Sequence, residues 1–228
     1  MPWVFFLCKK EEKSYTRNSF LSVILLTYTK MPKYTTIWID CDDVLSDTMN
    51  TVLTTPFFTE KKVTKADITS YNLREIPKLN VSIAQGYEIF RNFCISEDFR
   101  RMRPLPGARE KLETWKKENK KLIIITWRSA DRKPQTVKRL NQYFPGIFHP
   151  ENIIFAEELT NKEKSKVELC QEAGIEIMIE DRLPITQELA KHGIPSILFD
   201  TPRSKLPAGE TENPLITRVR NWNEIEIS

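Results

Sequence analysis

The chain has 228 residues, of which 40% are hydrophobic and 29% are charged, a composition typical of a folded globular protein rather than a disordered one. This length corresponds to one domain of ordinary size, or to one domain that carries an insert. The net charge is +4, but residues 1–30 contribute +3, so the rest of the chain carries only +1. Such a weak charge argues against nucleic-acid binding by the main body, which would need a basic track on its surface.

Residues 1–30 are best interpreted as an N-terminal extension to a main body of residues 31–228. The apolar segment 20–26 imitates the core of a signal peptide, but it comes late and lacks a clear small-residue cleavage site. Glu11 and Glu12 argue against a mitochondrial presequence, which is poor in acidic residues. A targeting segment and an extra structural element remain the alternatives.

No run of apolar residues is long enough to span a membrane, so no membrane partner is expected. The cysteines are far apart, have no metal-ligand spacing and occur in a chain too long to need a disulfide frame. We expect them to be reduced thiols in a cytoplasmic protein: Cys8, Cys41, Cys94 and Cys170.

The first predicted strand covers about residues 35–40 and leads into an acidic loop. The strand is apolar and partly β-branched, and Asp40, Asp42 and Asp43 stand at its carboxyl end. In open α/β sheets, ligands bind outside the carboxyl ends of the strands. Carboxylates this close together repel one another unless a cation lies among them, and Mg²⁺ prefers oxygen ligands. The loop is therefore a candidate Mg²⁺ site, with an ordinary acidic turn as the alternative.

Residues 48–103 show no strong strand and are interpreted as a small helical insert. Apolar residues recur at three- and four-residue spacing over 81–90, and a helix start is predicted at 64–68 with Thr64 or Asp67 as its cap. We expect the many aromatic residues of this region to form mainly its own core, with one or two available to stack on a planar ligand.

From residue 104 onward, predicted strands and helices alternate. Pro106 is expected in the first turn of the first of these helices. The alternation predicts an α/β fold, a Rossmann-like three-layer sandwich with a central parallel sheet. The helices are expected at about 108–119, 134–144, 164–173 and 185–192, and the strands at about 121–126, 152–156, 175–181, 195–200 and 216–222.

Polar residues of complementary chemistry follow three of the strands. Asp40 and Asp42 follow the first, Thr126 ends the second, and Glu180 with Asp181 ends the fourth. In a parallel sheet these ends share one edge, which would combine acids for a divalent cation with a hydroxyl for a phosphate. Phosphoryl transfer needs charge neutralisation, positioning and an in-line nucleophile. One carboxylate can be the nucleophile and a second the general acid and base.

A lysine would complete such a site by neutralising anionic charge. Lys166 and Lys164 both lie at the start of the helix that precedes the fourth strand, and either can fill this role.

In their order and spacing, these residues resemble the four motifs of the haloacid dehalogenase superfamily. The resemblance covers about residues 34–225. Within the superfamily, the chain is most similar to the 5'(3')-deoxyribonucleotidase-like group, which includes many bacterial members. The similar segments are 39–45, 104–108, 166–170 and 177–181, together with the basic-Asn-Trp ending at 218–222.

The resemblance implies a core of about residues 33–47 and 104–228, with the insert 48–103 as a cap. It also implies roles for individual residues. Asp40 would be the nucleophile and a metal ligand, and Asp42 the general acid and base with its backbone carbonyl on the metal. The phosphate would be bound by Thr126, Trp127 and Lys166, and Asp181 would complete the set of Mg²⁺ ligands.

Two positions depart from the group's usual pattern. Asp43 replaces a glycine that is usual in the animal enzymes, and Glu180 replaces an aspartate, which lengthens that arm by one methylene. Arg128, close to Thr126, is expected either to touch the phosphate or to be solvated.

We therefore predict an Mg²⁺-dependent phosphomonoester hydrolase that acts through an aspartyl-phosphate intermediate, a 5'-nucleotidase-like enzyme for nucleoside monophosphates. The alternatives are a phosphatase of another small phosphorylated metabolite and a non-catalytic binding protein of the same fold. A phosphatase of nucleic-acid ends is disfavoured, because the body is weakly charged and a cap favours small substrates. A homodimer is a further expectation.

Overall fold

The structure, a computed structural model, describes residues 34–156 and 166–227. Six parallel strands form one sheet in the order β3-β2-β1-β4-β5-β6. All six predicted strands are confirmed, most with slightly shorter bounds. They are β1 (Thr36–Ile39), β2 (Lys121–Thr126), β3 (Ile153–Phe155), β4 (Ile177–Glu180), β5 (Ser196–Phe199) and β6 (Ile216–Val219).

The strand order reverses at β1, which lies between β2 and β4. Ile39 of β1 pairs with Ile179 of β4, and the backbone N–H of Asp40 donates to the carbonyl oxygen of Ile179 over 2.9 Å. This register brings Asp40 level with the polar end of β4. In doubly wound sheets, the reversal of strand order leaves a crevice at the carboxyl edge, where ligands bind.

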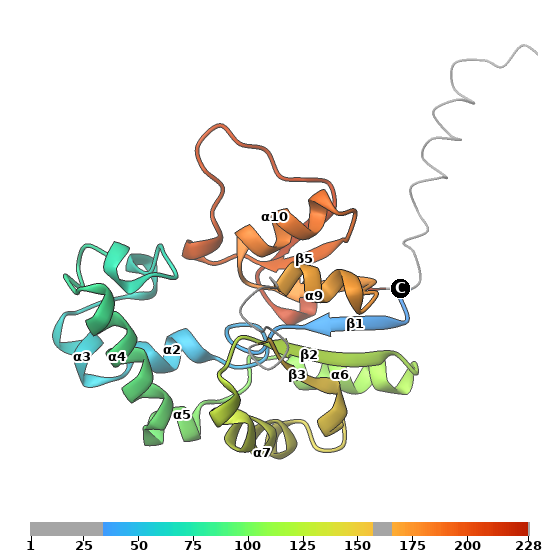
Figure 1. The fold of residues 1–228 in the computed structure, drawn as a ribbon, viewed down its shortest axis with the longest axis horizontal. Helices are drawn as coiled ribbons and strands as arrows, with labels where there is room; N and C mark the ends of the chain where they lie inside the picture. Colours follow the sequence, from blue (N-terminus) through green and yellow to red (C-terminus); the bar gives the residue numbers. More distant parts are fainter. Residues whose placement is uncertain (1–33, 157–165, 228) are drawn as a thin grey trace, which may run out of the picture. The chain divides into compact units, whose positions relative to one another are not determined.

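Helices cover both faces of the sheet, which confirms the three-layer sandwich (Figure 1). The helices α6 (Ala108–Lys117) and α7 (Lys133–Tyr143) lie on one face, and α9 (Lys166–Glu172) and α10 (Leu183–Lys191) on the other. Both faces of the central strands are therefore buried, which accounts for their nearly continuous apolar sequences. On the α9 and α10 face, the core includes Trp38, Ile125, Met178, Cys170 and Leu189.

The start of α6 differs from the prediction that Pro106 belongs to its first turn. Gly107 is the N-cap and has a φ of +83°, so the chain turns between Pro106 and Ala108 instead of entering the helix at the proline. A side chain at position 107 would also lie 3.0 Å from Oδ1 of Asn223 and 3.2 Å from Cβ of Trp222. The positive φ and the close contact together favour glycine at this position.

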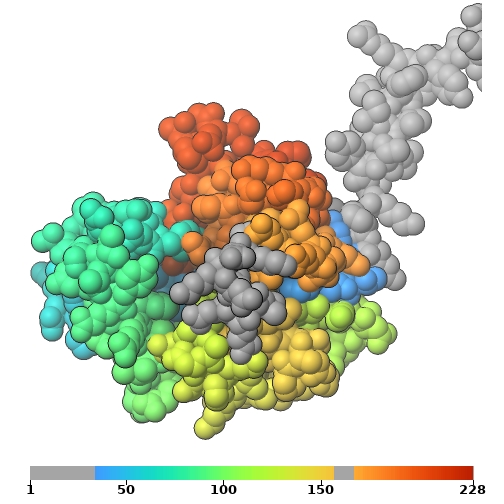
Figure 2. Space-filling model, viewed as in Figure 1, coloured from blue at the N-terminus to red at the C-terminus, as the bar shows by residue number. Residues whose placement is uncertain are grey.

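The insert, residues 48–103, contains only helices and turns, and it has a hydrophobic cluster of its own. In Figure 2 its atoms form one continuous block, coloured cyan to green. Phe58, Phe93 and Phe99 are buried in the cluster, as expected for core aromatics, whereas Tyr87 and Phe90 are exposed. Its elements are α2 (Thr48–Leu53), α3 (Pro56–Glu60), α4 (Ile83–Ile95), α5 (Glu97–Arg101) and the 3-10 turns η1 (Lys65–Asp67) and η2 (Leu73–Glu75).

The helix start predicted at residues 64–68 is confirmed, with Thr64 as the N-cap, but the helix is a single 3-10 turn. Thr64 and Asp67 form a reciprocal capping box around η1, but Ile68 already leaves the helical conformation. Because Ile68 is buried in the insert's core, tertiary packing redirects the chain after one turn.

Further 3-10 turns connect the core elements: η3 (Ala130–Arg132), η4 (Pro150–Asn152), η5 (Pro202–Ser204) and η6 (Trp222–Glu224). Among the residues described, no helix is both long and apolar enough to cross a bilayer. Cys41, Cys94 and Cys170 are buried, whereas Cys8 and the rest of the extension 1–30 lie outside the described residues.

Candidate active site

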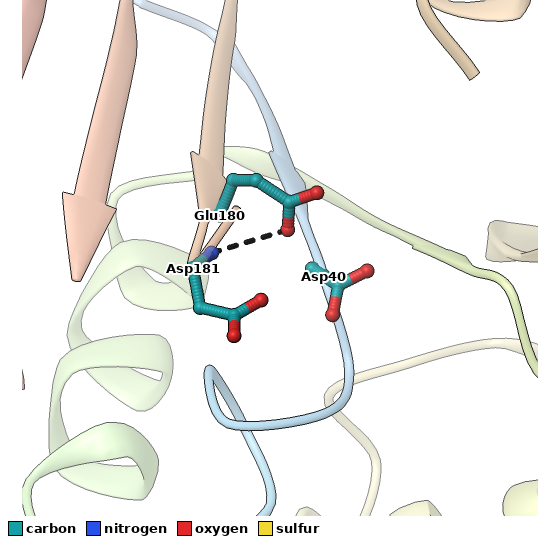
Figure 3. A group of neighbouring side chains, drawn as sticks. All are labelled: Asp40, Glu180 and Asp181. Atoms are coloured by element: carbon teal, nitrogen blue, oxygen red, sulfur yellow. Dashed lines mark hydrogen bonds between the residues drawn. The ribbon is translucent and has the colours of Figure 1, made fainter. Parts of the chain in front are cut away.

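Asp40, Glu180 and Asp181 form a buried acidic cluster at the carboxyl ends of β1 and β4. They are 7%, 0% and 4% exposed, and one carboxylate oxygen of each lies within 4.8 Å of the others. Figure 3 shows the three side chains directed toward a common space. Oε2 of Glu180 accepts the backbone N–H of Asp181 over 3.2 Å, which orients the longer glutamate arm. Adjacent strand ends thus bring together acids that are about 140 residues apart in sequence.

The electrostatics of this cluster suit a divalent cation. Burial raises the pKa of Asp181 well above its usual value, and the neighbouring Glu180 raises it further, although Arg203 acts in the opposite direction. Several buried carboxylates in one place are unfavourable unless a cation neutralises them. Because all the donors are carboxylate oxygens, the set fits a hard ion such as Mg²⁺.

Asp42 lies two residues after Asp40 but is held by an arginine. Its Oδ1 accepts from Oγ1 of Thr48 (2.6 Å) and from Nη2 of Arg128 (2.7 Å), and its Oδ2 accepts from Nε of Arg128 (2.9 Å). Burial opposes ionisation of this carboxyl, but the Arg128 guanidinium outweighs it and lowers the pKa of Asp42 to about 2. Asp42 is therefore a carboxylate near neutral pH, bound through both oxygens.

Arg128 itself is buried, so the alternative in which its side chain is solvated is wrong. Its Nη1 donates to Oγ1 of Thr136 (3.2 Å), and its guanidinium carbon lies 5.0 Å from the ring centre of Phe99 in the insert. Arg139 lies 4.9 Å from the same ring and donates to the carbonyl oxygen of Phe99 over 2.8 Å. Contacts of Phe99 with Arg128 and Arg139 thus connect the insert to the core next to Asp42. A contact between Arg128 and phosphate stays a prediction.

The predicted phosphate-binding residues lie on two elements. Thr126 ends β2 and is buried, and its Oγ1 accepts the backbone N–H of Arg128 over 3.2 Å. Trp127 is 42% exposed, so it would contact a phosphate or substrate through its backbone or through one face of its ring. Lys166 is the first residue of α9, but its side chain and all of Lys164 lie outside the described residues. The choice between the two lysines therefore stays open.

Asp43 is part of the site's framework rather than an exposed extra charge. Its φ of +57° is a backbone conformation that favours glycine, and aspartate is among the few other residues that tolerate it. Its Oδ1 accepts the backbone N–H of Met49 over 2.7 Å, and its Oδ2 accepts from Arg203. Burial raises the pKa of Asp43, and Arg203 opposes that rise.

Three residues that the sequence analysis did not assign to the site support it. Arg203 contacts both Asp43 and Asp181, and the hydroxyl of Tyr71 donates to the carbonyl oxygen of Asp181. The indole Nε1 of Trp222 donates to the carbonyl oxygen of Val44 over 2.8 Å. Trp222 had a sequence signal, since it belongs to the basic-Asn-Trp ending. Tyr71 was one of the insert's aromatic residues, but nothing in the sequence placed it beside Asp181, and Arg203 had no signal.

A hollow lies beside the cluster, where the acidic loop, the insert and the segment after β5 meet. It shares Asp43 and Arg203 with the site, but Asp40 does not line it. Its other lining residues are Asp47, Met49, Lys65, Ile68, Leu105, Phe199, Asp200, Thr201, Pro202 and Arg220.

Comparison with protein families gives a match to one family over nearly all of the described chain. The family is described as 5' nucleotidase, deoxy (pyrimidine), cytosolic type C protein, and its model matches residues 34–227. No curated protein matches the chain.

Solved structures show the same fold at low sequence identity. A haloacid dehalogenase family hydrolase from Deinococcus radiodurans, with bound phosphate and sodium, is 14% identical to this chain, with a TM-score of 0.54. The match covers 75% of this chain and 85% of the hydrolase. A haloacid dehalogenase-like hydrolase from Streptococcus pneumoniae is 18% identical with a TM-score of 0.54, and the match covers 75% of this chain and 86% of that one. A haloacid dehalogenase-like protein of unknown function from Agrobacterium tumefaciens is 14% identical with a TM-score of 0.51, covering 73% and 82%.

Proposed function

Since this chain belongs to the family of 5' nucleotidase, deoxy (pyrimidine), cytosolic type C proteins, and so to the phosphatases of the haloacid dehalogenase superfamily, we propose that it is an Mg²⁺-dependent nucleotidase. It removes phosphate from nucleoside monophosphates through an aspartyl phosphate on Asp40. The observation that carries this proposal is the buried cluster of Asp40, Glu180 and Asp181 at the strand-order reversal, with Asp42 beside it. The substrate class rests on the description of the family.

In the first half of the reaction, a carboxylate oxygen of Asp40 attacks the phosphorus. The bond between phosphorus and the ester oxygen breaks, and Asp42, which must first be released from Arg128 and take up a proton from solvent, gives that proton to the leaving oxygen. In the second half, Asp42 takes a proton from a water molecule whose oxygen attacks the phosphorus. The bond to Asp40 then breaks, which regenerates the carboxylate and releases inorganic phosphate.

Asp40, Asp181 and the backbone carbonyl of Asp42 would hold the Mg²⁺, with Glu180 beside them. The bound ion would neutralise the charge of the phosphate oxygens. Thr126 and the backbone at Trp127 would bind the phosphate from the other side, and Lys166, with Lys164 as the alternative, would neutralise the remaining charge.

The insert 48–103 would act as a cap on a core of residues 33–47 and 104–228. Its contacts with the core cluster near the acids: Phe99 packs against Arg128, and Tyr71 packs against Arg203. A cap in this place would exclude water and restrict the leaving group to small molecules. We place the protein in the cytoplasm, where buried thiols such as those of Cys41 and Cys94 stay reduced.

The first test measures phosphate release from a panel of ribo- and deoxyribonucleoside monophosphates and unrelated phosphomonoesters, with and without Mg²⁺. We expect Mg²⁺-dependent release that is lost in Asp40→Asn and ranks nucleotides above other esters. Another ranking would indicate a different phosphorylated metabolite. Release that persists in Asp40→Asn would mean that another residue is the nucleophile. Binding of phosphate esters without any release would favour a non-catalytic protein of this fold.

A homodimer through α4 is a further part of the proposal. The helix exposes a stripe of large apolar residues, Ile83, Tyr87 and Phe90, and Ile95 at its end is also exposed. Glu88 and Arg91 flank the stripe, so two antiparallel α4 helices related by a two-fold axis near residues 89 and 90 would place each glutamate beside the other copy's arginine. The stripe thus complements a second copy of itself in both apolar character and charge.

Sedimentation of the full chain tests the dimer. We expect a concentration-dependent dimer that Tyr87→Glu dissociates, because this change places a charge at the centre of the stripe. Lys117→Glu, at an exposed position on α6, is the control and should leave the dimer intact. A wild-type monomer at high concentration would refute this interface.

A further inference from the structure

Arg203 occupies a buried position between two carboxylates that come from different loops. It lies in η5, directly after β5, and its side chain is only 8% exposed. One of its nitrogens, Nη2, donates to Oδ2 of Asp181 over 3.0 Å and also to Oδ2 of Asp43. One guanidinium therefore fixes one carboxylate oxygen of a predicted metal ligand.

Asp43 gives this arginine a fixed anchor. Its second oxygen is held by the backbone N–H of Met49 at the start of α2, so its carboxylate cannot rotate freely. The loop after β1 and the segment after β5 are thus joined through Arg203. This arrangement gives a physical role to Asp43, the residue that departs from the glycine usual in the animal enzymes: its charge keeps Arg203 beside Asp181.

Tyr71 extends the same network into the insert. Its ring contacts two guanidiniums, with the ring centre 4.8 Å from Cζ of Arg182 and 4.6 Å from Cζ of Arg203. Its hydroxyl donates to the backbone carbonyl of Asp181. Asp181 is therefore held at its carboxylate by Arg203 and at its backbone by a residue of the insert.

From this geometry we propose that Arg203 is a positioning residue for the metal ligand Asp181, and that Tyr71 couples the seating of the insert to that ligand. The inference rests on the proposed function, because it takes Asp181 as an Mg²⁺ ligand. By fixing one oxygen of Asp181, Arg203 orients the carboxylate toward Asp40 and Glu180 (Figure 3). Displacement of the insert would remove Tyr71 and with it the restraint on the backbone of Asp181.

A different role for Arg203 predicts the opposite effect on metal affinity. If the guanidinium only neutralises the acids, it competes with Mg²⁺ for them, and its removal should tighten metal binding. If it positions Asp181, its removal should weaken metal binding, typically 10- to 100-fold for a partner of a metal ligand. The sign of the change therefore separates the two roles.

The experiment is titration calorimetry of the full chain with Mg²⁺, alongside the Mg²⁺ concentration that gives half-maximal phosphate release. We expect Arg203→Met to weaken Mg²⁺ binding by about 10-fold or more, and Arg203→Lys to recover part of the loss. Tyr71→Phe keeps the stacked ring but removes one hydrogen bond, so a loss of about 5-fold is expected. Circular dichroism verifies that each variant is folded.

Arg182→Met is the matched control. Arg182 also contacts the ring of Tyr71, but within the described residues it makes no ion pair with Asp181. We expect its Mg²⁺ affinity to change less than 3-fold. Unchanged or tighter Mg²⁺ binding in Arg203→Met would overturn the positioning role while leaving the proposed function intact. Absence of Mg²⁺ binding by the wild type would instead overturn the proposed function.

Discussion

Asp42 can protonate a leaving group only if one of its oxygens is released from Arg128 and takes up a proton, because the paired carboxyl is ionised. Both oxygens accept hydrogen bonds from the guanidinium, and Thr48 adds a third bond. A bidentate pair with so little exposure on the arginine side is expected to be strong. A bound phosphate would be a second anion for the Arg128 guanidinium. Competition between the two anions would allow the hydrogen bonds from Arg128 to Asp42 to break.

A double-mutant cycle with Asp42→Asn and Arg128→Met measures the strength of this pair. We expect a coupling free energy of about 2 kcal/mol in urea unfolding, because the arginine is buried and the pair is bidentate. The exposed pair of Arg109 and Glu113 on α6 is the control, and its coupling should stay below about 0.5 kcal/mol. Equal coupling in both cycles would show that Arg128 does not hold Asp42 tightly.

At the scale of elements, the pairing of β1 with β4 is reinforced far from the active site. Glu176, just before β4, accepts from the backbone N–H groups of Thr35 (2.6 Å) and Thr36 (2.9 Å) and from Oγ1 of Thr35 (2.9 Å). The hydrogen bond from Thr36 is the largest influence on the pKa of Glu176 and lowers it. Burial, the second largest influence, acts in the opposite direction, but the pKa remains lowered. The carboxylate thus secures the start of the two strands whose opposite ends hold the acidic cluster.

This contact predicts a pH dependence of stability. Because the folded state lowers the pKa of Glu176, the unfolded state binds more protons in acid, and the contribution of Glu176 is lost as pH falls through and below about 4.5. At pH 7, Glu176→Gln should be less stable than the wild type by about 1 kcal/mol. Urea unfolding should show this difference shrinking as the pH is lowered. A difference that is constant across pH would contradict the assignment.

The presence of most strands and helices can be predicted from local sequence patterns, but the residues at which some of them begin or end cannot. The strands β2 and β4 and the helices α6, α7 and α10 could be predicted because apolar periodicity reports burial directly. Short segments of the insert could not, since the end of η1 at Ile68 depends on packing in a core assembled from residues far apart in sequence. The same holds for Gly107, whose neighbours Trp222 and Asn223 come from the opposite end of the chain.

At the scale of the whole molecule, the acidic cluster lowers the free energy of unfolding of the metal-free protein. Asp40, Glu180 and Asp181 are buried within 4.8 Å of one another, and their mutual repulsion opposes folding. A cation that binds only the folded state removes this repulsion and adds its own binding free energy.

Asp181→Asn is therefore expected to have opposite effects with and without metal. Without Mg²⁺, the variant should unfold at a higher temperature than the wild type, because one buried charge is removed. With Mg²⁺ at 100 times its dissociation constant, the wild type should gain about 2.7 kcal/mol and become the more stable protein. Thermal unfolding in chelator and in Mg²⁺ tests this, with Asp200→Asn as a control outside the cluster. A less stable variant in both conditions would contradict repulsion as the dominant effect.

The sequence by itself determined the alternation of strands and helices, the helical insert and the acids at the strand ends. These features are local, because periodicity, strand termini and motif spacing are properties of neighbouring residues. Only the tertiary structure decided that Asp42 is bound by Arg128, that Asp43 is compensated by Arg203, and that Tyr71 of the insert contacts Asp181. Each of these contacts joins residues more than 80 positions apart, and a long polar side chain looks the same in sequence whether it is solvated or buried against a partner. The physical reason is that charge compensation depends on three-dimensional proximity, which is set by strand order and by packing of the insert.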